Sequence, residues 1–469
     1  MSAPSAVSGT RLHAKSLTGG GAREVVGFHD MQRNEDCTFQ PAEGGRTRCL
    51  PATATANQTG TFSDPGCQVP SLSAPAPTCS DDVKYGITLG YNNNCSAGEP
   101  TELRKFLDPA TPRYIQGPTG CSVAPAIPVT PTRPATVPLG DVIPWTDFVE
   151  AIETIVPGSP VSEKVLVATD GARQHVGYRD DKLGADCSFQ LMSDGITRCV
   201  PAAREGQIYY GDASCTRPLA VNDYSNGSTC SVTASEAVIA NLWLEPSVDV
   251  CGGIRNVYRL GTYDGSASGA SIFQMTNQPP SGAPSNSPGV ATCQASGTLG
   301  NGFSNYRTVG DVINTSLPST PRVSTGGTDR LVPALVWPPA ADALVPGWHD
   351  TMSDVDCTFT LATDGKMRCL PLASKATILF TDDACKSPTV VAVLSEPSCI
   401  GLRRYARVVS TTCPPTTKIY ALGPDAKDLM SASVAAGPGQ CGKVTQAMAA
   451  FDATEMAPSQ FVEGVPAVE

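Results

Sequence analysis

Residues 347–371 read GWHDTMSDVDCTFTLATDGKMRCLP, and the same pattern occurs as GFHDMQRNEDCTFQPAEGGRTRCLP at 27–51 and as GYRDDKLGADCSFQLMSDGITRCVP at 177–201. The three stretches align without insertion or deletion. A block that recurs along a chain indicates an internal repeat, in which each copy is one structural unit. We therefore predict three tandem repeats, at residues 9–160, 161–325 and 326–469.

The cysteines divide equally among the repeats, six of the 18 in each, with none left over. Their spacings are too long for a zinc knuckle, so we interpret them as disulfides rather than metal ligands. Six cysteines allow 15 pairings. We favour sequential pairing, first with second, third with fourth and fifth with sixth, because each pair then brackets one expected hairpin. The predicted disulfide cysteines are Cys37, Cys49, Cys67, Cys79, Cys95 and Cys121; Cys187, Cys199, Cys215, Cys230, Cys251 and Cys293; and Cys357, Cys369, Cys385, Cys399, Cys413 and Cys441.

The repeated block predicts a β-hairpin. If Cys37 and Cys49 face each other, Phe39 lies opposite Thr47 and the turn falls at residues 43–44. Each turn segment ends in a glycine, where a positive φ favours that residue. These glycines are Gly45, Gly195 and Gly365.

Charged residues recur within the block. In the expected register, the aspartate before the first cysteine and the arginine before the second are diagonal neighbours on the face opposite the disulfide. We predict a structural ion pair in each hairpin, and the alternative is a polar site repeated three times for calcium or sugar hydroxyls. The candidate pairs are Asp36 with Arg48, Asp186 with Arg198, and Asp356 with Arg368. Asp30, Asp180 and Asp350 recur as well, two residues after an aromatic residue.

Further repeated segments predict strands, turns and one helix. RLHAKSL, KVLVATD and RLVPALVW precede the block, and KYGITLGY, NVYRLGTY and KIYALGPD follow it; all read as strands. We count about seven or eight strands per repeat. Asp64, Asp212 and Asp382 each stand three residues before the third cysteine, a position typical of an Asx turn. GDVIPWTDFVEAIETI, from residue 140, predicts a short helix.

The composition indicates an all-β fold. Charged residues make up 16% of the chain, while glycine (44) and proline (41) are abundant, which favours short strands and many turns. Eight strands are two four-stranded propeller blades, so the three disulfide-stapled repeats could close into one six-bladed β-propeller-like ring. The alternative is three separate small β domains.

Charge and cysteine content restrict partners and compartment. A net charge of -11 disfavours nucleic-acid binding. The chain has no run of 18 apolar residues, so we expect no transmembrane segment. The first residues lack the features of a signal peptide, yet 18 cysteines in equal sets indicate an oxidising compartment. We therefore expect an extracellular or outer cell-surface location, with an export signal, such as a lipoprotein signal, missing from this sequence.

No catalytic, cofactor-binding or metal-ligating residue can be assigned from the sequence. His29 and His349 occupy equivalent positions, but the second repeat has Arg179 there, and a permanent cation cannot replace a general base or a ligand. Motifs for a nucleophile elbow, a P-loop and a zinc protease are absent from the chain. We expect no cofactor, and the absence of these motifs disfavours an enzyme.

The pattern (W/F/Y)-x-D, then D-C-(S/T)-F, then G-x-x-R-C-(L/V)-P, followed by aromatic-x-D-x-x-C, resembles a family of uncharacterised, exported, cysteine-rich repeat proteins of myxobacterial type. All three repeats match it, except that Glu43, Gly44 and Gly45 replace an Asp-Gly turn in the first. The resemblance implies secretion or a lipid-anchored outer surface and carries no activity.

Three functions remain open. The leading hypothesis is a non-enzymatic extracellular or cell-surface protein that binds an unknown ligand, a glycan or a protein, because no catalytic set is recognisable. The second is an exported polysaccharide hydrolase or lyase whose carboxylates converge in a cleft. The third is a passive envelope scaffold.

Overall fold

The chain is all-β in the computed structural model. No α-helix occurs in the residues that the structure describes, where the only helical elements are short 3-10 turns. The described residues are 6–68, 70–75, 84–90, 100–107, 113–118, 120–124, 136–192, 194, 196–201, 203–205, 208–222, 242–246, 254–263, 271–278, 290–298, 305–319, 329–336, 345–380, 390–394, 404–410, 414–429, 432–437, 440–444 and 448–469.

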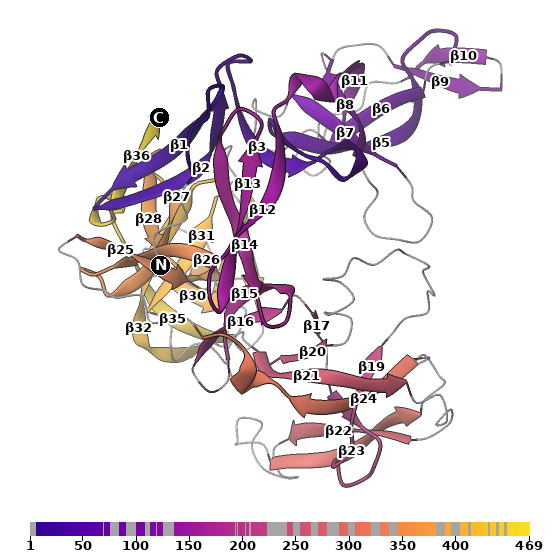
Figure 1. Ribbon diagram of the computed structural model, residues 1–469. Coiled ribbons are helices and arrows are strands. Elements are labelled where there is room, and N and C mark those ends of the chain that lie inside the picture. Colours follow the sequence, from indigo (N-terminus) through magenta and orange to yellow (C-terminus); the bar gives the residue numbers. More distant parts are fainter. Residues whose placement is uncertain are drawn as a thin grey trace.

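A central 14-stranded antiparallel sheet connects the three repeats, and it lies on the left in Figure 1. Its strand order is β16-β15-β14-β13-β12-β4-β3-β2-β1-β36-β28-β27-β26-β25. Each repeat supplies a four-stranded meander that contains the repeated block. The meanders are β1 (Leu12–Gly19), β2 (Ala22–Asp30), β3 (Glu35–Pro41) and β4 (Thr47–Leu50); β13 (Val161–Ala168), β14 (Arg173–Asp180), β15 (Ala185–Leu191) and β16 (Thr197–Pro201); and β25 (Leu331–Val336), β26 (Val345–Asp350), β27 (Val355–Leu361) and β28 (Met367–Pro371).

Two strands join one meander to another. Strand β12 (Glu150–Val156) pairs with β4 of the first repeat and with β13 of the second. Strand β36 (Glu463–Val468) pairs with β28 of the third repeat and with β1 of the first. The repeats are therefore linked through continuous backbone hydrogen bonding at two junctions.

Buried side chains also cross the junctions between repeats. Phe28 and the Cys37–Cys49 disulfide form one core with Leu166 of the second repeat. In the same way, Trp348 packs in a core that includes Leu17 of the first repeat. Burying a leucine or aromatic side chain stabilises by about 1.5–3 kcal/mol, so each meander stabilises its neighbour as well as itself.

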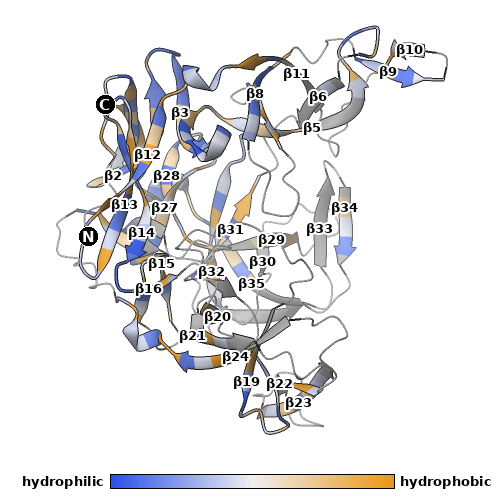
Figure 2. Ribbon diagram, turned by 45° about the vertical axis from the view of Figure 1, so that its right-hand side comes forward, coloured by the Kyte–Doolittle hydropathy of each residue, from blue (hydrophilic) through white to orange (hydrophobic). Residues whose placement is uncertain are grey.

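A peripheral sheet follows each meander. Those of the first and second repeats extend to the upper and lower right in Figure 1, and the outer strands of the third lie at the right in Figure 2. The first consists of β5 (Thr53–Phe62), β6 (Pro70–Pro75), β7 (Tyr85–Leu89), β8 (Pro100–Phe106), β9 (Tyr114–Gly117), β10 (Gly120–Val123) and β11 (Thr136–Ile143). The second consists of β17 (Arg204–Glu205), β18 (Ile208–Tyr210), β19 (Pro218–Asn222), β20 (Leu242–Pro246), β21 (Ile254–Tyr263), β22 (Ser271–Gln278), β23 (Val290–Thr298) and β24 (Asn305–Val312). The third consists of β29 (Ser374–Phe380), β30 (Val390–Leu394), β31 (Tyr405–Val409), β32 (Thr417–Leu429), β33 (Ala432–Gly437), β34 (Gln440–Val444) and β35 (Met448–Glu455).

A short 3-10 turn brings the chain back from each peripheral sheet to its meander. These turns are η2 (Trp145–Asp147), η4 (Asn314–Ser316) and η6 (Pro458–Gln460). The hairpin turn of the first block is a further 3-10 element, η1 (Glu43–Gly45), and Gly45 has the expected positive φ of 72°. Gly365 has a φ of 76°, while Gly195 lies outside the described residues.

The all-β prediction is confirmed, and the propeller is wrong. The described strands form four sheets and no closed propeller, which agrees with the alternative of separate small β domains for the three peripheral sheets. The strand count was too low, because each repeat has twelve strands within its described residues. Several of them lie in proline- and serine-rich segments, where pairing with a neighbouring strand outweighs weak local propensity. The boundaries of the repeats stay a prediction.

The expected helix from residue 140 is also wrong. The segment contains the end of β11, the turn η2 and strand β12. Pro144 interrupts any helix because it lacks an amide donor. The β-branched residues Ile152, Thr154 and Ile155 then pair with β13.

Disulfide pairing follows the sequence order only for the first two cysteines. Cys37–Cys49, Cys187–Cys199 and Cys357–Cys369 are formed as expected. The third cysteine, however, pairs with the sixth, in Cys67–Cys121 and Cys215–Cys293. For the first two repeats, the expected pairing of third with fourth and fifth with sixth is therefore wrong. In the first repeat, hydrogen bonding brings β9 and β10 back beside the end of β5. Cys79, Cys95, Cys230, Cys251, Cys385, Cys399 and Cys413 lie outside the described residues.

We expect the third repeat to follow the pairing of the first two. Cys441 is disulfide-bonded, and its equivalents Cys121 and Cys293 bind the third cysteine of their repeats. Peptide mapping of the unreduced protein by mass spectrometry should therefore recover a peptide that links Cys441 to Cys385. The fourth cysteine should be linked to the fifth in every repeat. A Cys385–Cys399 peptide would contradict this pattern.

Candidate functional site

A buried aspartate ends the second strand of each meander. Asp30, Asp180 and Asp350 are at most 1% exposed. Asp30 accepts two hydrogen bonds from the Arg11 guanidinium, at 2.9 and 2.6 Å, and further bonds from the amides of Gln32 and Arg33. Burial alone would raise the pKa of Asp30, but these donors, Arg11 foremost, hold it below its ordinary value.

The arginine also holds the 3-10 turn of its repeat. Arg11 donates to the carbonyl oxygen of Asp147 in η2, at 2.7 Å. In the third repeat, Arg330 binds Asp350 in the same bidentate way and donates to the carbonyl of Gln460 at 2.7 Å. The returning turn is thereby fixed against the corner that follows the second strand.

The second repeat lacks this arginine. Val161 pairs with Asp180 as Leu12 pairs with Asp30, so Pro160 stands at the position of Arg11. Asp180 still accepts bonds from the amides of Lys182 and Leu183. Its other carboxylate oxygen is buried without a hydrogen-bond partner among the described residues.

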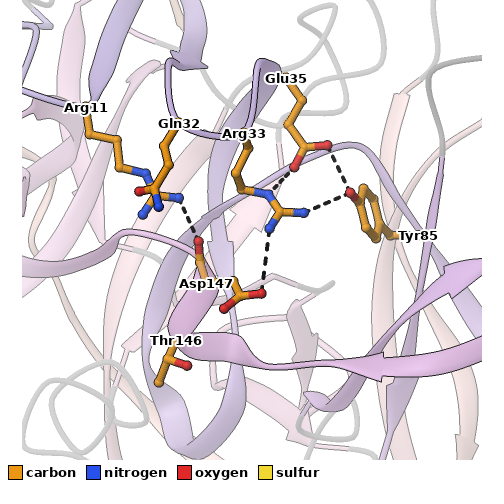
Figure 3. A pocket seen from close by; sticks show the side chains of 7 residues that line it. All are labelled: Arg11, Gln32, Arg33, Glu35, Tyr85, Thr146 and Asp147. Carbon is orange, nitrogen blue, oxygen red and sulfur yellow. Dashed lines mark hydrogen bonds and ion pairs between the residues drawn. The ribbon is translucent and has the colours of Figure 1, made fainter.

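A polar pocket of about 510 Å³ opens beside the arginine of the first repeat. Its walls come from the corner between β2 and β3, from the start of β7 and from η2, and Figure 3 shows Arg33 at its centre. Arg33 is ion-paired with Glu35, donates to the hydroxyl of Tyr85 at 3.0 Å, and lies 3.8 Å from the carboxylate of Asp147. The Tyr85 hydroxyl donates in turn to Glu35 at 3.0 Å.

Two aromatic rings lie next to Arg33, the central cation of the pocket. The Arg33 guanidinium lies 4.3 Å from the ring centre of Phe148 and 6.0 Å from that of Tyr85, within cation–π range. Phe148 and Tyr85 belong to a core cluster with Leu50 and Leu103. Burial and the neighbouring Glu35 raise the pKa of Tyr85, which keeps its hydroxyl protonated at neutral pH. The base of the pocket is therefore fixed by packing.

The pocket is charged only in the first repeat. Strand registers place Leu183, Ala185 and Leu242 of the second repeat at the positions of Arg33, Glu35 and Tyr85, and the two leucines pack in an apolar cluster there. The third repeat has Ser353, Val355 and Tyr405 at these positions. Asp147 corresponds to Ser316 and to Gln460. The charges of the first pocket are thus not needed to fold the repeat.

The six residues expected to form ion pairs have other partners. Phe39 lies opposite Cys49 rather than Thr47, so the register is shifted by two positions from the expected one. Arg48 therefore faces Gln40, four residues or roughly 13 Å along the strand from Asp36. Equivalent registers separate Asp186 from Arg198 and Asp356 from Arg368.

Each aspartate of this set instead contacts a lysine, arginine or histidine side chain on its own face. Asp36 is bound by Lys15 and lies 2.8 Å from His29 on β2. Asp356 lies 2.9 Å from His349, and Asp186 is bound by Lys164 and lies 3.6 Å from Arg179. The histidines and Arg179 thus play the same cross-strand role, which explains why one type replaces the other.

Each arginine of this set is buried and binds an acidic side chain in the turn of its own hairpin. Arg48 contacts Glu43 and Glu150, both at 3.0 Å, and donates to the carbonyl of Phe148. Arg368 likewise contacts Asp364 and donates to the carbonyl of Phe461, and Arg198 contacts Asp194.

The remaining expectations concern turns, metals and membranes. Asp64 and Asp212 accept bonds from backbone amides that follow them, as an Asx turn requires, while Asp382 lies outside the described residues. The described part of the chain contains no group of three or more potential ligands placed to hold a metal ion. Within that part, no helix has the length and apolar character needed to cross a membrane.

Comparison with known proteins relates the chain to one family of unknown function. A family model with the description "Family of unknown function (DUF7481)" matches residues 133–268 and 338–430, together just under half of the chain. This similarity agrees with the expected resemblance to an uncharacterised family, whereas myxobacterial origin stays a prediction. Arg33, Glu35 and Tyr85 lie outside the matched segments. Searches of curated proteins and of solved structures found no match.

The ion pair between Arg330 and the buried Asp350 should be a large source of stability. Replacing Arg330 with leucine leaves a buried carboxylate without its cation, which we expect to cost about 3–5 kcal/mol of unfolding free energy at neutral pH. The matched change Arg179→Leu removes a cation from Asp186, whose side chain is 42% exposed, and should cost only about 0–1 kcal/mol. Urea denaturation measures both.

The same pair should make stability depend on acid pH. Burial raises the pKa of Asp350, but the donors around it, Arg330 foremost, outweigh burial and lower the pKa below 3.8. Its contribution is therefore complete above pH 3.8 and is lost as the pH falls through the lowered value. The difference in unfolding free energy between wild type and Arg330→Leu should narrow in that range. A difference that stays constant down to the lowest pH would contradict this assignment.

Proposed function

We propose that the protein is a non-enzymatic binding protein of the extracellular space or the cell surface, and that its ligand occupies the polar pocket of the first repeat. One observation carries the proposal. Arg33, Glu35, Tyr85 and Asp147 form a charged, hydrogen-bonded set in one repeat, where the second repeat has leucine, alanine, leucine and serine in the same fold. Polar groups that folding does not require, gathered in a pocket, are typical of a binding site.

The disulfides support the proposed extracellular or cell-surface location. Five disulfides lie within the described residues, and proteins keep such bonds in oxidising surroundings such as the cell exterior. Two of them close loops of 54 and 78 residues within the peripheral sheets. The chain-entropy model assigns about 4 kcal/mol to loops of this size, so the cross-links suit a protein that must persist outside the cell.

The arrangement of the carboxylates favours binding over catalysis. Glycoside hydrolysis needs two carboxyl groups with separate tasks, one of which donates a proton. In the pocket, Glu35 and Asp147 both face one cation, Arg33. The pocket lining contains no histidine, cysteine or lysine in the described part of the chain. A polysaccharide hydrolase or lyase and a passive scaffold therefore remain secondary proposals.

The second repeat supplies the substitutions that test the site. A variant with Arg33→Leu, Glu35→Ala, Tyr85→Leu and Asp147→Ser should fold, because the second repeat folds with these residues. Wild type and variant are screened by thermal shift against oligosaccharides, amino acids, short peptides and organic anions. A ligand at 100 times its Kd should stabilise the wild type by about 2.7 kcal/mol and leave the variant unchanged.

The third repeat provides the matched control. Ser353→Leu, Val355→Ala, Tyr405→Leu and Gln460→Ser make the same conversion away from the proposed site, so the thermal shift should equal that of wild type. The proposal would be contradicted if every ligand stabilised the wild type, the first-repeat variant and the third-repeat control equally. Turnover of a ligand by the wild type would contradict it as well.

A further inference from the structure

The pocket of the first repeat has one gap that a ligand atom could fill. Arg33 uses Nε and Nη2 on Glu35 and Tyr85, whereas Nη1 lies 3.8 Å from the nearer carboxylate oxygen of Asp147. That separation exceeds a hydrogen bond of 2.7–3.2 Å. An oxygen atom beside both groups could accept from Arg33 and, if it carried a hydrogen, donate to Asp147. A hydroxyl group has both capacities in one atom.

The charges around the gap disfavour an ionic ligand. Arg11 is neutralised by Asp30, and Arg33 is neutralised by Glu35, which leaves Asp147 as the excess charge. An anion would meet two carboxylates, and the chain as a whole carries a net charge of -11. A cation bound to Asp147 would lie next to the guanidinium of Arg33. An uncharged group that both donates and accepts meets no such penalty.

The surfaces of the pocket disfavour an apolar or aromatic ligand. Tyr85 is 5% and Phe148 2% exposed, and Arg33 lies over the Phe148 ring, so neither ring presents a face for stacking. The accessible groups are polar, including Gln32 and Thr146 at the rim, as Figure 3 shows. The Asp147 side chain is 47% exposed and can be reached from solvent.

We propose that the ligand is an uncharged saccharide whose hydroxyl groups bridge Arg33 and Asp147 at the edge of a sugar ring. This inference rests on the proposed function and narrows it to one chemical class. Adjacent hydroxyls of a sugar can use both oxygens of Asp147 together with the side-chain amide of Gln32. A pocket of about 510 Å³ falls within the range of small-molecule sites and has room for a short saccharide.

Calorimetry with three classes of oligosaccharide tests the inference on the full oxidised chain. The probes are neutral gluco-, manno- and galacto-oligosaccharides, oligogalacturonates as anions, and chitosan oligosaccharides as cations. We expect binding within the neutral class only. Because a neutral ligand has no net charge to screen, its Kd should change less than about twofold between low and high salt.

Single substitutions then test whether Arg33 and Asp147 bind the sugar hydroxyl. Asp147→Ala and Arg33→Leu should each weaken binding at least tenfold, or about 1.4 kcal/mol. Asp147→Asn keeps an acceptor and should retain part of the affinity. The matched control Gln460→Ala changes the residue of the third repeat that corresponds to Asp147 and should leave the Kd unchanged.

The outcomes separate the inference from the proposed function. Binding confined to the acidic or cationic oligosaccharides, or to none of the three classes, overturns the saccharide inference. The proposed function survives either result if the thermal-shift screen finds another ligand that the four-residue variant loses. A neutral oligosaccharide that binds the four-residue variant as well as the wild type overturns both.

Discussion

The corner held by Asp30 and Arg11 is the contact on which the first repeat depends. The carboxylate fixes two backbone amides after β2, and the guanidinium that neutralises it also grips the carbonyl of Asp147. One buried ion pair therefore positions the corner that carries Arg33 and the turn that carries Asp147. A buried carboxylate is costly without such partners, so the arrangement is rigid once formed.

The three repeats show what this corner permits. All keep the aspartate, the hairpin disulfide and the buried arginine at the end of the hairpin, and these contacts hold the meander together. The side chains at the pocket positions next to the corner differ between the repeats. They are mostly apolar in the second repeat, polar and apolar in the third, and mostly charged in the first. The scaffold tolerates each choice because its stability comes from the disulfide, the core and the strand pairing. A polar pocket could thus arise in one repeat without loss of the fold.

The all-β class and the hairpin disulfide followed from the sequence, because they depend on local patterns that occur three times along the chain. The register was missed by two positions, since facing cysteines were assumed where the bond joins diagonal neighbours, and the ion pairs from Asp36 to Arg48 failed with it. The bonds from Cys67 to Cys121 and from Cys215 to Cys293 depend on long-range return of the chain, which no spacing reveals. Similarity between the repeats does not reveal the pocket residues Arg33, Glu35, Tyr85 and Asp147, because these residues differ from one repeat to the next. Their only sequence signal is the difference between one repeat and the others.

In the first two repeats, the bond between the third and sixth cysteines closes a loop that carries part of the peripheral sheet. Between Cys67 and Cys121, and between Cys215 and Cys293, the chain leaves and returns at nearly one point, with Cα atoms 5.7 and 5.8 Å apart. The two ends of the enclosed loop are therefore equally close in both repeats, whether the loop spans 54 residues or 78. Insertions within the loop need not propagate to the meander, and a backbone cut there leaves both fragments attached. Such a module can diverge in length and surface while its neighbours remain under separate selection.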